Sequence, residues 1–212
     1  THSIGGMVAR AALDDPPLRG STDVRPARIA GLVTLATPHE GMPIASREGA
    51  EVLKALRPAL IASLVGLPII STSPDWILFV TSLLSLSSAG GSEGFKDLAF
   101  DSVGFTDWKG SPGNPELAAL RQRELQRQLT GRYVAYAGDN PGPLFLESVF
   151  RDLNFGFQND WLVPVGSGRF EKASIQGRTF PGVNHLSILD MGTALVAVNG
   201  LDVVLGEFGA AG

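Results

Sequence analysis

Thr1-His2-Ser3-Ile4-Gly5-Gly6, at the start of the chain, places a serine just ahead of an apolar run. Residues 4–13 carry apolar side chains at near-helical spacing, which predicts a helix leaving the serine. Where a strand turns sharply into a helix, a serine at the tip has a strained backbone, and the residues two before and two after it must be small. Gly5 meets this demand, whereas Thr1 carries a branched side chain. The stretch therefore predicts a strand-to-helix turn with Ser3 at its tip.

This stretch resembles the nucleophile elbow of α/β-hydrolases of the lipase and serine-esterase kind, GPI-inositol-deacylase-like hydrolases included, which often reads Gly-His-Ser-x-Gly-Gly. The resemblance implies an α/β fold: a parallel sheet flanked by helices, with an inserted helical cap and Ser3 as the nucleophile. It also implies that the Ile4 backbone N–H binds an oxyanion and that His2 and Gly5 line the site. The family has strands before the elbow. We therefore expect the C-terminal portion of the fold here, the rest lying in a missing N-terminal segment or a partner chain.

A second match follows the predicted helix. Residues 29–36 form a short apolar run, as expected of a buried parallel strand, and lead into Thr37-Pro38-His39-Glu40-Gly41. In the same families a strand ending in Thr-Pro-His-x-Gly commonly follows the elbow helix. Pro38 stops the strand ladder and Gly41 allows a tight turn. Because the base of this fold comes from the last loop, the resemblance gives His39 the part of lining or bracing the site.

The third match concerns the acid of the triad. Asn159-Asp160-Trp161-Leu162-Val163-Pro164 resembles the family form Asn-Asp-Gly-x-Val-Pro, in which the aspartate is the triad acid. Trp161 stands where glycine is common. Asp139 is the alternative acid, because it directly follows a predicted strand at residues 132–138 and some hydrolases carry the acid there. The flanking residues favour Asp160.

The resemblance places the base after the last predicted strand. That strand covers residues 174–180, and His185 lies in the loop that follows it. His185 is therefore predicted to be the base, whereas His2, the neighbour of Ser3 in sequence, is expected to point elsewhere.

Residues 42–95 have the most unusual composition in the chain. Residues 56–70 are nearly uncharged and apolar, and a second apolar run covers residues 76–86. Each run is too short to span a membrane, which needs about 20 apolar residues. We therefore expect an inserted helical cap, with residues 1–41 and 96–212 forming the core. Such a cap shelters an acyl chain and docks on a lipid surface; the alternative is that its helices only pack on the core.

Composition excludes several other classes of protein. The 212 residues are 44% hydrophobic and 18% charged, which suits one globular domain. A net charge of -4 and a pI near 5.3 argue against a nucleic-acid partner. There is no cysteine, and none of the three histidines is paired at ligand spacing, so we expect no disulfide, no metal and no cofactor. Localisation is left open by the sequence.

The resemblance implies a serine hydrolase that cleaves carboxylic esters, with acyl or lipid esters as substrates, through Ser3, His185 and Asp160 and an acyl-enzyme. Two alternatives stay open: a non-catalytic binding module with this fold, and an N-terminal-nucleophile hydrolase that uses Thr1. In the family the second oxyanion donor comes from a loop that precedes the elbow. We therefore expect the isolated chain to be inactive.

Overall fold

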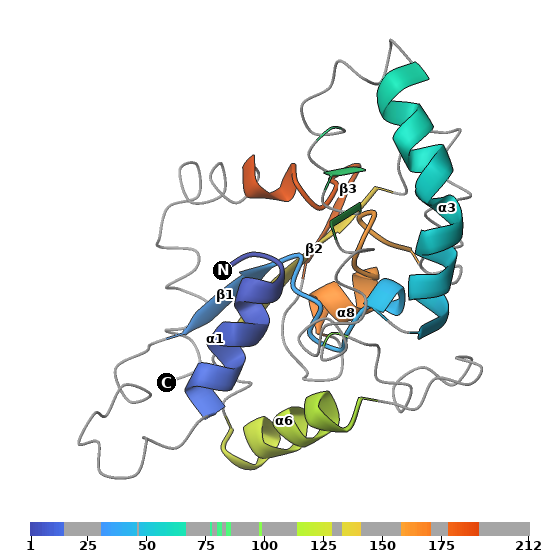
Figure 1. The fold of residues 1–212 in the computed structure, drawn as a ribbon. Coiled ribbons are helices and arrows are strands. Elements are labelled where there is room, and N and C mark those ends of the chain that lie inside the picture. Colours follow the sequence, from blue (N-terminus) through green and yellow to red (C-terminus); the bar gives the residue numbers. More distant parts are fainter. Residues whose placement is uncertain are drawn as a thin grey trace.

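In the computed structural model, a parallel sheet is flanked by helices, so the architecture is α/β (Figure 1). The described strands are β1 (Leu32–Leu35), β2 (Tyr133–Asp139) and β3 (Arg178–Pro181). The described helices are α1 (Ile4–Asp14), the 3-10 turn η1 (Pro43–Ala45), α3 (Arg47–Gly66), α6 (Pro115–Gln126) and α8 (Val165–Arg169). The structure describes residues 1–14, 31–45, 47–66, 77, 80, 81, 84, 85, 98, 114–128, 133–140, 158–170 and 178–190.

The three described strands lie in the order β1-β2-β3, and both pairs are parallel. Leu32 of β1 is opposite Tyr133 of β2, and Tyr136 of β2 is opposite Arg178 of β3. β2 is buried along almost its whole length, as expected of a central parallel strand covered on both faces. Because the strands are parallel, the loops that follow all three meet at one edge of the sheet, the carboxyl edge.

The residues before Ser3 extend the sheet beside β1, on the side away from β2. His2 and Leu35 form a parallel bridge, the Leu35 N–H donates to the Thr1 carbonyl at 2.9 Å, and the Ser3 N–H donates to the Leu35 carbonyl at 3.0 Å. The chain then turns directly into α1. Ser3 therefore also lies at the carboxyl edge, beside the loops that follow the strands.

Helices cover one face of the sheet closely. α1 and α8 pack there through a cluster of buried residues: Leu13, Leu32, Tyr133, Ala135 and Phe170. A Cβ atom on Gly168 of α8 would lie 2.9 Å from the Ala137 side chain, so α8 rests almost directly on β2. The opposite face buries Val134 and Tyr136 against Ile188.

α3 belongs to a third buried cluster, which joins it to α1, η1, α6 and the loop at 161–163. Leu53 and Leu60 are its fully buried side chains, while Ile61 is exposed. The helix begins at Arg47, ahead of the predicted apolar run at residues 56–70, because its first half is already amphipathic. No helix in the described part of the chain is both long and apolar enough to cross a membrane. The boundaries of the predicted cap stay a prediction.

The predicted helix after Ser3 is confirmed, and β1, β2 and β3 overlap the strands predicted at residues 29–36, 132–138 and 174–180. α6 begins at a capped N-terminus: the Asn114 side chain accepts hydrogen bonds from the N–H groups of Glu116 at 3.0 Å and Leu117 at 3.2 Å. The predicted strands at 29–36 and 174–180 are longer than β1 and β3, and their first residues lie outside the described ranges.

Candidate active site

Ser3 occupies a left-handed backbone conformation at the junction of the sheet and α1. Its φ is 52°, which is uncommon for a residue with a side chain. Hydrogen bonds on both sides enforce this conformation: the Gly5 N–H donates to the His2 carbonyl and the Gly6 N–H to the Ser3 carbonyl, both at 3.0 Å. The predicted sharp turn at Ser3 is confirmed, and its strain is held in place by the bonds around it.

The steric demand for a small residue falls on Gly6 rather than on Gly5. A Cβ atom on Gly5 would meet nothing within 4 Å, whereas one on Gly6 would lie 2.2 Å from Thr37 Oγ1 and 2.5 Å from Thr37 Cγ2. The expectation that crowding requires a glycine at Gly5 is therefore corrected. The close approach of α1 to the loop after β1 places the demand one residue later.

His185 links Ser3 to Asp160. Its Nε2 lies 3.0 Å from Ser3 Oγ, and its Nδ1 lies 3.0 Å from Asp160 Oδ2. His185 and Asp160 are 3% and 1% exposed, so water does not compete for the contact between them. A carboxylate only accepts hydrogen bonds, so Nδ1 carries the proton of the neutral ring and Nε2 is free to accept from the serine hydroxyl.

Asp160 is fixed by its own loop. Its Oδ1 accepts hydrogen bonds from the N–H groups of Leu162 at 3.1 Å and Val163 at 2.8 Å, which leaves Oδ2 for His185. The Asp160 carbonyl also accepts from the His185 N–H at 2.8 Å. The backbone carbonyl and the carboxylate of Asp160 thus both contact His185, and the orientation of the carboxylate is fixed by its own loop.

Trp161 has a φ of 94°, a value that favours glycine. Its N–H donates to Asn159 Oδ1 at 2.9 Å, and its side chain is 6% exposed, in the same buried cluster as Met7 and Leu186. The backbone at Trp161 therefore matches the glycine of the motif that the stretch resembles, while the indole adds apolar packing beside the acid.

Asp139 lies at the end of β2, where its carbonyl accepts from the Gly182 N–H at 2.8 Å. Among the described carboxylates, Asp160 is the one in hydrogen-bond contact with His185. Gly138 explains how the two loops meet here, because a Cβ atom on it would lie 2.2 Å from the Val183 carbonyl oxygen and 3.1 Å from Asp160 Cβ. The absence of a side chain at Gly138 lets the acid and base loops close over β2.

The Ile4 N–H is the first of α1 and has no acceptor in the described part of the chain. It follows Ser3 directly, and the positive end of the helix dipole adds to its attraction for an anion. The arrangement suits an oxyanion formed on a group bonded to Ser3 Oγ.

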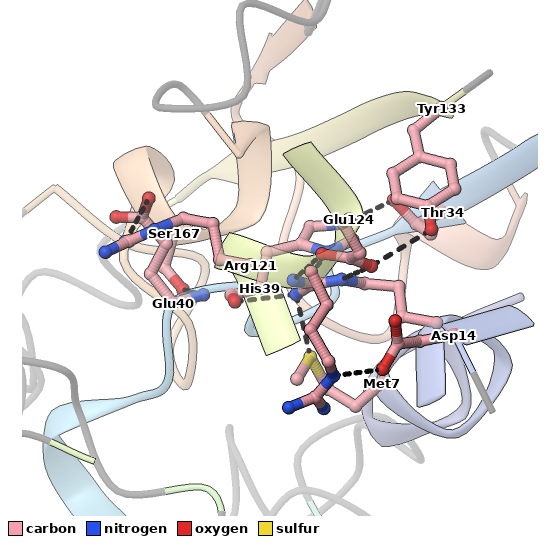
Figure 2. Close-up of polar contacts among 11 residues, drawn as sticks. Met7, Asp14, Thr34, His39, Glu40, Arg121, Glu124, Tyr133 and Ser167 are labelled. Atoms are coloured by element: carbon pink, nitrogen blue, oxygen red, sulfur yellow. Dashed lines mark hydrogen bonds and ion pairs between the residues drawn. The ribbon is translucent and has the colours of Figure 1, made fainter. Parts of the chain in front are cut away.

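His39 braces the loop after β1 from inside the protein. Its Nε2 lies 2.7 Å from Thr34 Oγ1 and its Nδ1 lies 3.3 Å from Arg10 Nη1 (Figure 2). A guanidinium only donates, so Nδ1 accepts and the Nε2–H donates to Thr34. Its ring stacks on Phe170 with centroids 4.5 Å apart. Burial, together with the Arg10 charge, holds the pKa of His39 well below 6.5, so the ring is neutral at pH 7. Of the two predicted parts, bracing fits this position; no described contact joins His39 to Ser3, His185 or Asp160.

The pair of Arg10 and Glu124 was not anticipated from the sequence. Both side chains are fully buried, with Arg10 Nε 2.9 Å from Glu124 Oε1 and Arg10 Nη2 2.6 Å from Glu124 Oε2. Figure 2 shows Tyr133 beside Glu124, which its hydroxyl contacts at 3.0 Å. The spacing of Arg10 from Met7, three residues along the predicted helix, is the sequence signal that it shares the buried face.

The His2 ring contacts the backbone of His185, and no described contact joins it to Ser3. Its Nε2 lies 2.8 Å from the His185 carbonyl oxygen, and the two rings lie 4.8 Å apart. The structure thus brings together Ser3, His185, Asp160, His2 and the Ile4 N–H. Within the described ranges, no group of histidine and carboxylate side chains is suited to hold a metal ion. In comparisons with known proteins, no family model matches this chain, and no curated protein matches it either.

Proposed function

We propose that the protein is a serine hydrolase that cleaves carboxylic esters. The observation that carries the proposal is the chain of hydrogen bonds from Ser3 Oγ through His185 to Asp160 Oδ2, with both links at 3.0 Å. The left-handed Ser3 at the start of α1 supports it further, because this conformation presents the hydroxyl at the carboxyl edge of the sheet.

The chemistry follows from the hydrogen bonds of the His185 ring. Its Nε2 accepts the hydroxyl proton while Ser3 Oγ attacks the acyl carbon, and Asp160 stabilises the imidazolium that forms. The Ile4 N–H binds the oxyanion of the tetrahedral intermediate. The carbon–oxygen bond to the alcohol then breaks, and His185 returns its proton to the leaving oxygen. Water, activated by the same imidazole, releases the acid from Ser3.

The proposal extends to the fold. Four parallel segments follow one another across the sheet in chain order: residues 1–2, β1, β2 and β3. The serine follows the first segment, the acid follows β2 and the base follows β3, which is the order in an α/β-hydrolase. α3 joins the apolar cluster that contains Trp161, beside the acid, and Leu186, beside the base, so an acyl or lipid ester is the favoured substrate class.

The test is labelling of the intact protein with a fluorophosphonate, followed by peptide mass spectrometry. We expect label on Ser3, none in Ser3→Ala, and a strong loss in His185→Ala. Asp160→Asn and Asp139→Asn form a matched pair: the first loses most of the labelling rate and the second keeps it.

Each alternative gives a different result in the same experiment. A folded protein that takes no label is a binding module, and label on Thr1 makes it an N-terminal-nucleophile hydrolase. The Thr1 amino group donates to the Val33 carbonyl at 2.8 Å, which occupies it in the sheet.

A further inference from the structure

We infer that His2 is a positioning residue that sets the distance between the serine and the base by holding the His185 backbone against the strand that carries Ser3. This inference rests on the proposed function, because it assigns His2 a part in the same site. The His2 ring is not itself a base for Ser3, since its Nε2 is engaged by the His185 carbonyl at 2.8 Å.

The direction of this hydrogen bond is fixed by chemistry. A carbonyl oxygen only accepts, so His2 Nε2 carries a proton and donates it to His185. The donor sits one residue before Ser3, and the acceptor belongs to the residue whose ring contacts Ser3 Oγ. Together with the contact between His185 Nε2 and Ser3 Oγ, this hydrogen bond links the elbow to His185 at two points.

The other described anchors of His185 lead to a different part of the molecule. Its N–H donates to the Asp160 carbonyl at 2.8 Å, and its Nδ1 contacts Asp160 Oδ2 at 3.0 Å. Both fix the histidine relative to the acid loop. Apart from the reacting contact with Ser3 Oγ, the bond from His2 is the described hydrogen bond that fixes His185 relative to the elbow.

His2 is held firmly enough to act as an anchor. It pairs with Leu35 in a parallel bridge, and its carbonyl accepts the Gly5 N–H at 3.0 Å. Burial, and then the nearby His185, lower the pKa of His2 below 6.5. A neutral His2 places no second cation beside the imidazolium that forms on His185 during attack.

Three substitutions separate the hydrogen bond from the bulk of the ring. In His2→Gln the amide nitrogen reaches about as far as Nε2 of histidine, so the bond to the carbonyl is retained. His2→Asn carries the same amide one methylene shorter, and His2→Leu has no donor. In the intact protein, we expect His2→Gln to stay within a few-fold of the wild type in kcat for a short nitrophenyl ester. We expect about a 100-fold loss of kcat with little change in KM for His2→Asn and His2→Leu, the size of effect that misplacing a reacting group by about 1 Å produces.

A second readout does not depend on turnover. NMR spectra of the wild type and the same variants follow two signals. One is the proton between His185 Nδ1 and Asp160, and the other comes from the ring nitrogens of His2 and His185. We expect the His2 Nε2–H tautomer in the wild type, and a His185 signal that changes in His2→Asn and His2→Leu but is restored in His2→Gln. Thermal unfolding of each variant shows that it is folded.

The outcomes are distinct. If the wild type turns over and labels but His2→Asn equals His2→Gln in kcat, or the His185 signal is the same in all variants, the inference is wrong and the proposed function stands. If the wild type neither turns over nor labels, while the His185 signal still depends on the donor at position 2, the proposed function fails and the positioning contact is upheld.

Discussion

Ser3 and Trp161 are two residues of the site whose backbones adopt positive φ values, 52° and 94°. Such conformations cost about 1–3 kcal/mol each and persist only where the surrounding structure enforces them. At Ser3 the strained backbone directs the hydroxyl toward His185. At Trp161 it lets the chain fold back so that Leu162 and Val163 can donate to Asp160. The strain at both residues is thus tied to the orientation of a group in the proposed triad.

The strain at Trp161 can be measured by comparing two truncations. Trp161→Ala and Trp161→Gly both remove the buried indole, a loss of about 3–5 kcal/mol in the free energy of unfolding. Only glycine adopts the positive φ freely, so Trp161→Gly should be more stable than Trp161→Ala by about 1 kcal/mol, the reverse of the usual order. Urea unfolding of both variants checks this. Equal stability, or a more stable alanine variant, would show that the backbone at Trp161 is unstrained.

His39 makes stability depend on pH. Its pKa in the folded protein lies well below the unfolded value of 6.5, so above that value both states are neutral and His39 contributes no pH dependence. As the pH falls below 6.5, the unfolded chain binds a proton that the folded protein refuses. The free energy of unfolding should then fall by up to about 1.4 kcal/mol per pH unit for this one group.

Urea unfolding between about pH 8 and about pH 5 measures this slope. His39→Gln should lower stability at high pH, because a buried partner of Thr34 and Arg10 is altered, yet flatten the acid slope. His2→Gln is the matched control, since the pKa of His2 is also lowered but its ring is only half-buried, so it should flatten the slope less. A slope that His39→Gln leaves unchanged would assign the acid sensitivity to other groups.

At the scale of residues, the sequence predicted which side chains meet but not all of their directions. Ser3, Asp160 and His185 were predicted from motifs that resemble those of α/β-hydrolases, in the chain order that the resemblance implies. Parallel strands end at a common edge, which explains why the residues of these separate motifs meet. Packing between segments far apart in the chain determines the direction of the His2 ring. The same kind of packing gives His39 its bracing role. No local pattern encodes that packing.

At the scale of elements, α1 carries two neighbouring glycines with opposite surroundings. Gly5→Ala adds a methyl group to open space in a helix and should raise the free energy of unfolding by about 0.5–1 kcal/mol. Gly6→Ala drives a Cβ atom into Thr37 and should lower it by about 1–3 kcal/mol. Thermal or urea unfolding compares the two variants directly.

The control for Gly6→Ala is the addition of Thr37→Ala. The Thr37 hydroxyl is buried without a hydrogen-bond partner in the described structure, so its removal alone should change stability little. In the Gly6→Ala background it removes the two nearest atoms, and stability should recover in part. If the stability changes of Gly6→Ala and Thr37→Ala simply add in the double variant, the contact between α1 and Thr37 is not the cause of the lost stability.

The buried Arg10–Glu124 pair joins α1 to α6. Glu124→Leu leaves a buried guanidinium without its carboxylate and should cost about 3–5 kcal/mol in unfolding free energy. The double variant Arg10→Met, Glu124→Leu removes both charges and should lose less than Glu124→Leu alone. Lys54 and Glu51 give the matched control: their contact is 2.7 Å but both side chains are more than half exposed, so Glu51→Gln should change stability by less than about 1 kcal/mol. A Glu124→Leu loss as small as that of Glu51→Gln would contradict the prediction.

Elements with a strong local signal were predicted well. The apolar spacing after Ser3 predicted α1, and Asn114 followed by Pro115 is the local signal at the start of α6. α3 was predicted less well, because its first half mixes charged and apolar residues and its buried face is defined only by packing against Trp161 and η1. The amphipathic first half of α3 stands out less in composition than the apolar run at residues 56–70.

At the scale of the whole molecule, the site depends on contacts of very different range. Asp160 and His185 are 25 residues apart, whereas Ser3 and His185 are 182 apart. The bonds that shape the Asp160 loop are local and can form early, but the contact between serine and base requires the whole sheet to assemble. Reactivity of Ser3 should therefore appear in refolding with the same rate constant as global folding.

This expectation is tested by diluting the intact protein from denaturant and quenching aliquots into a fluorophosphonate, while tryptophan fluorescence follows folding. Ser3→Ala corrects for labelling elsewhere. Labelling that precedes the main fluorescence change would mean that the elbow and the histidine loop meet before the sheet is complete.

The same separation has a consequence for synthesis on the ribosome. Ser3 leaves the exit tunnel before His185, so until the histidine loop has followed it, the Ser3 hydroxyl has the reactivity of an ordinary alcohol. If the proposed triad is correct, a nascent or truncated chain that ends before the histidine loop has no activated serine. In the proposed triad, the distance in sequence between Ser3 and His185 therefore protects the growing chain, because the serine meets its base only after the histidine loop has been made and has folded against the elbow.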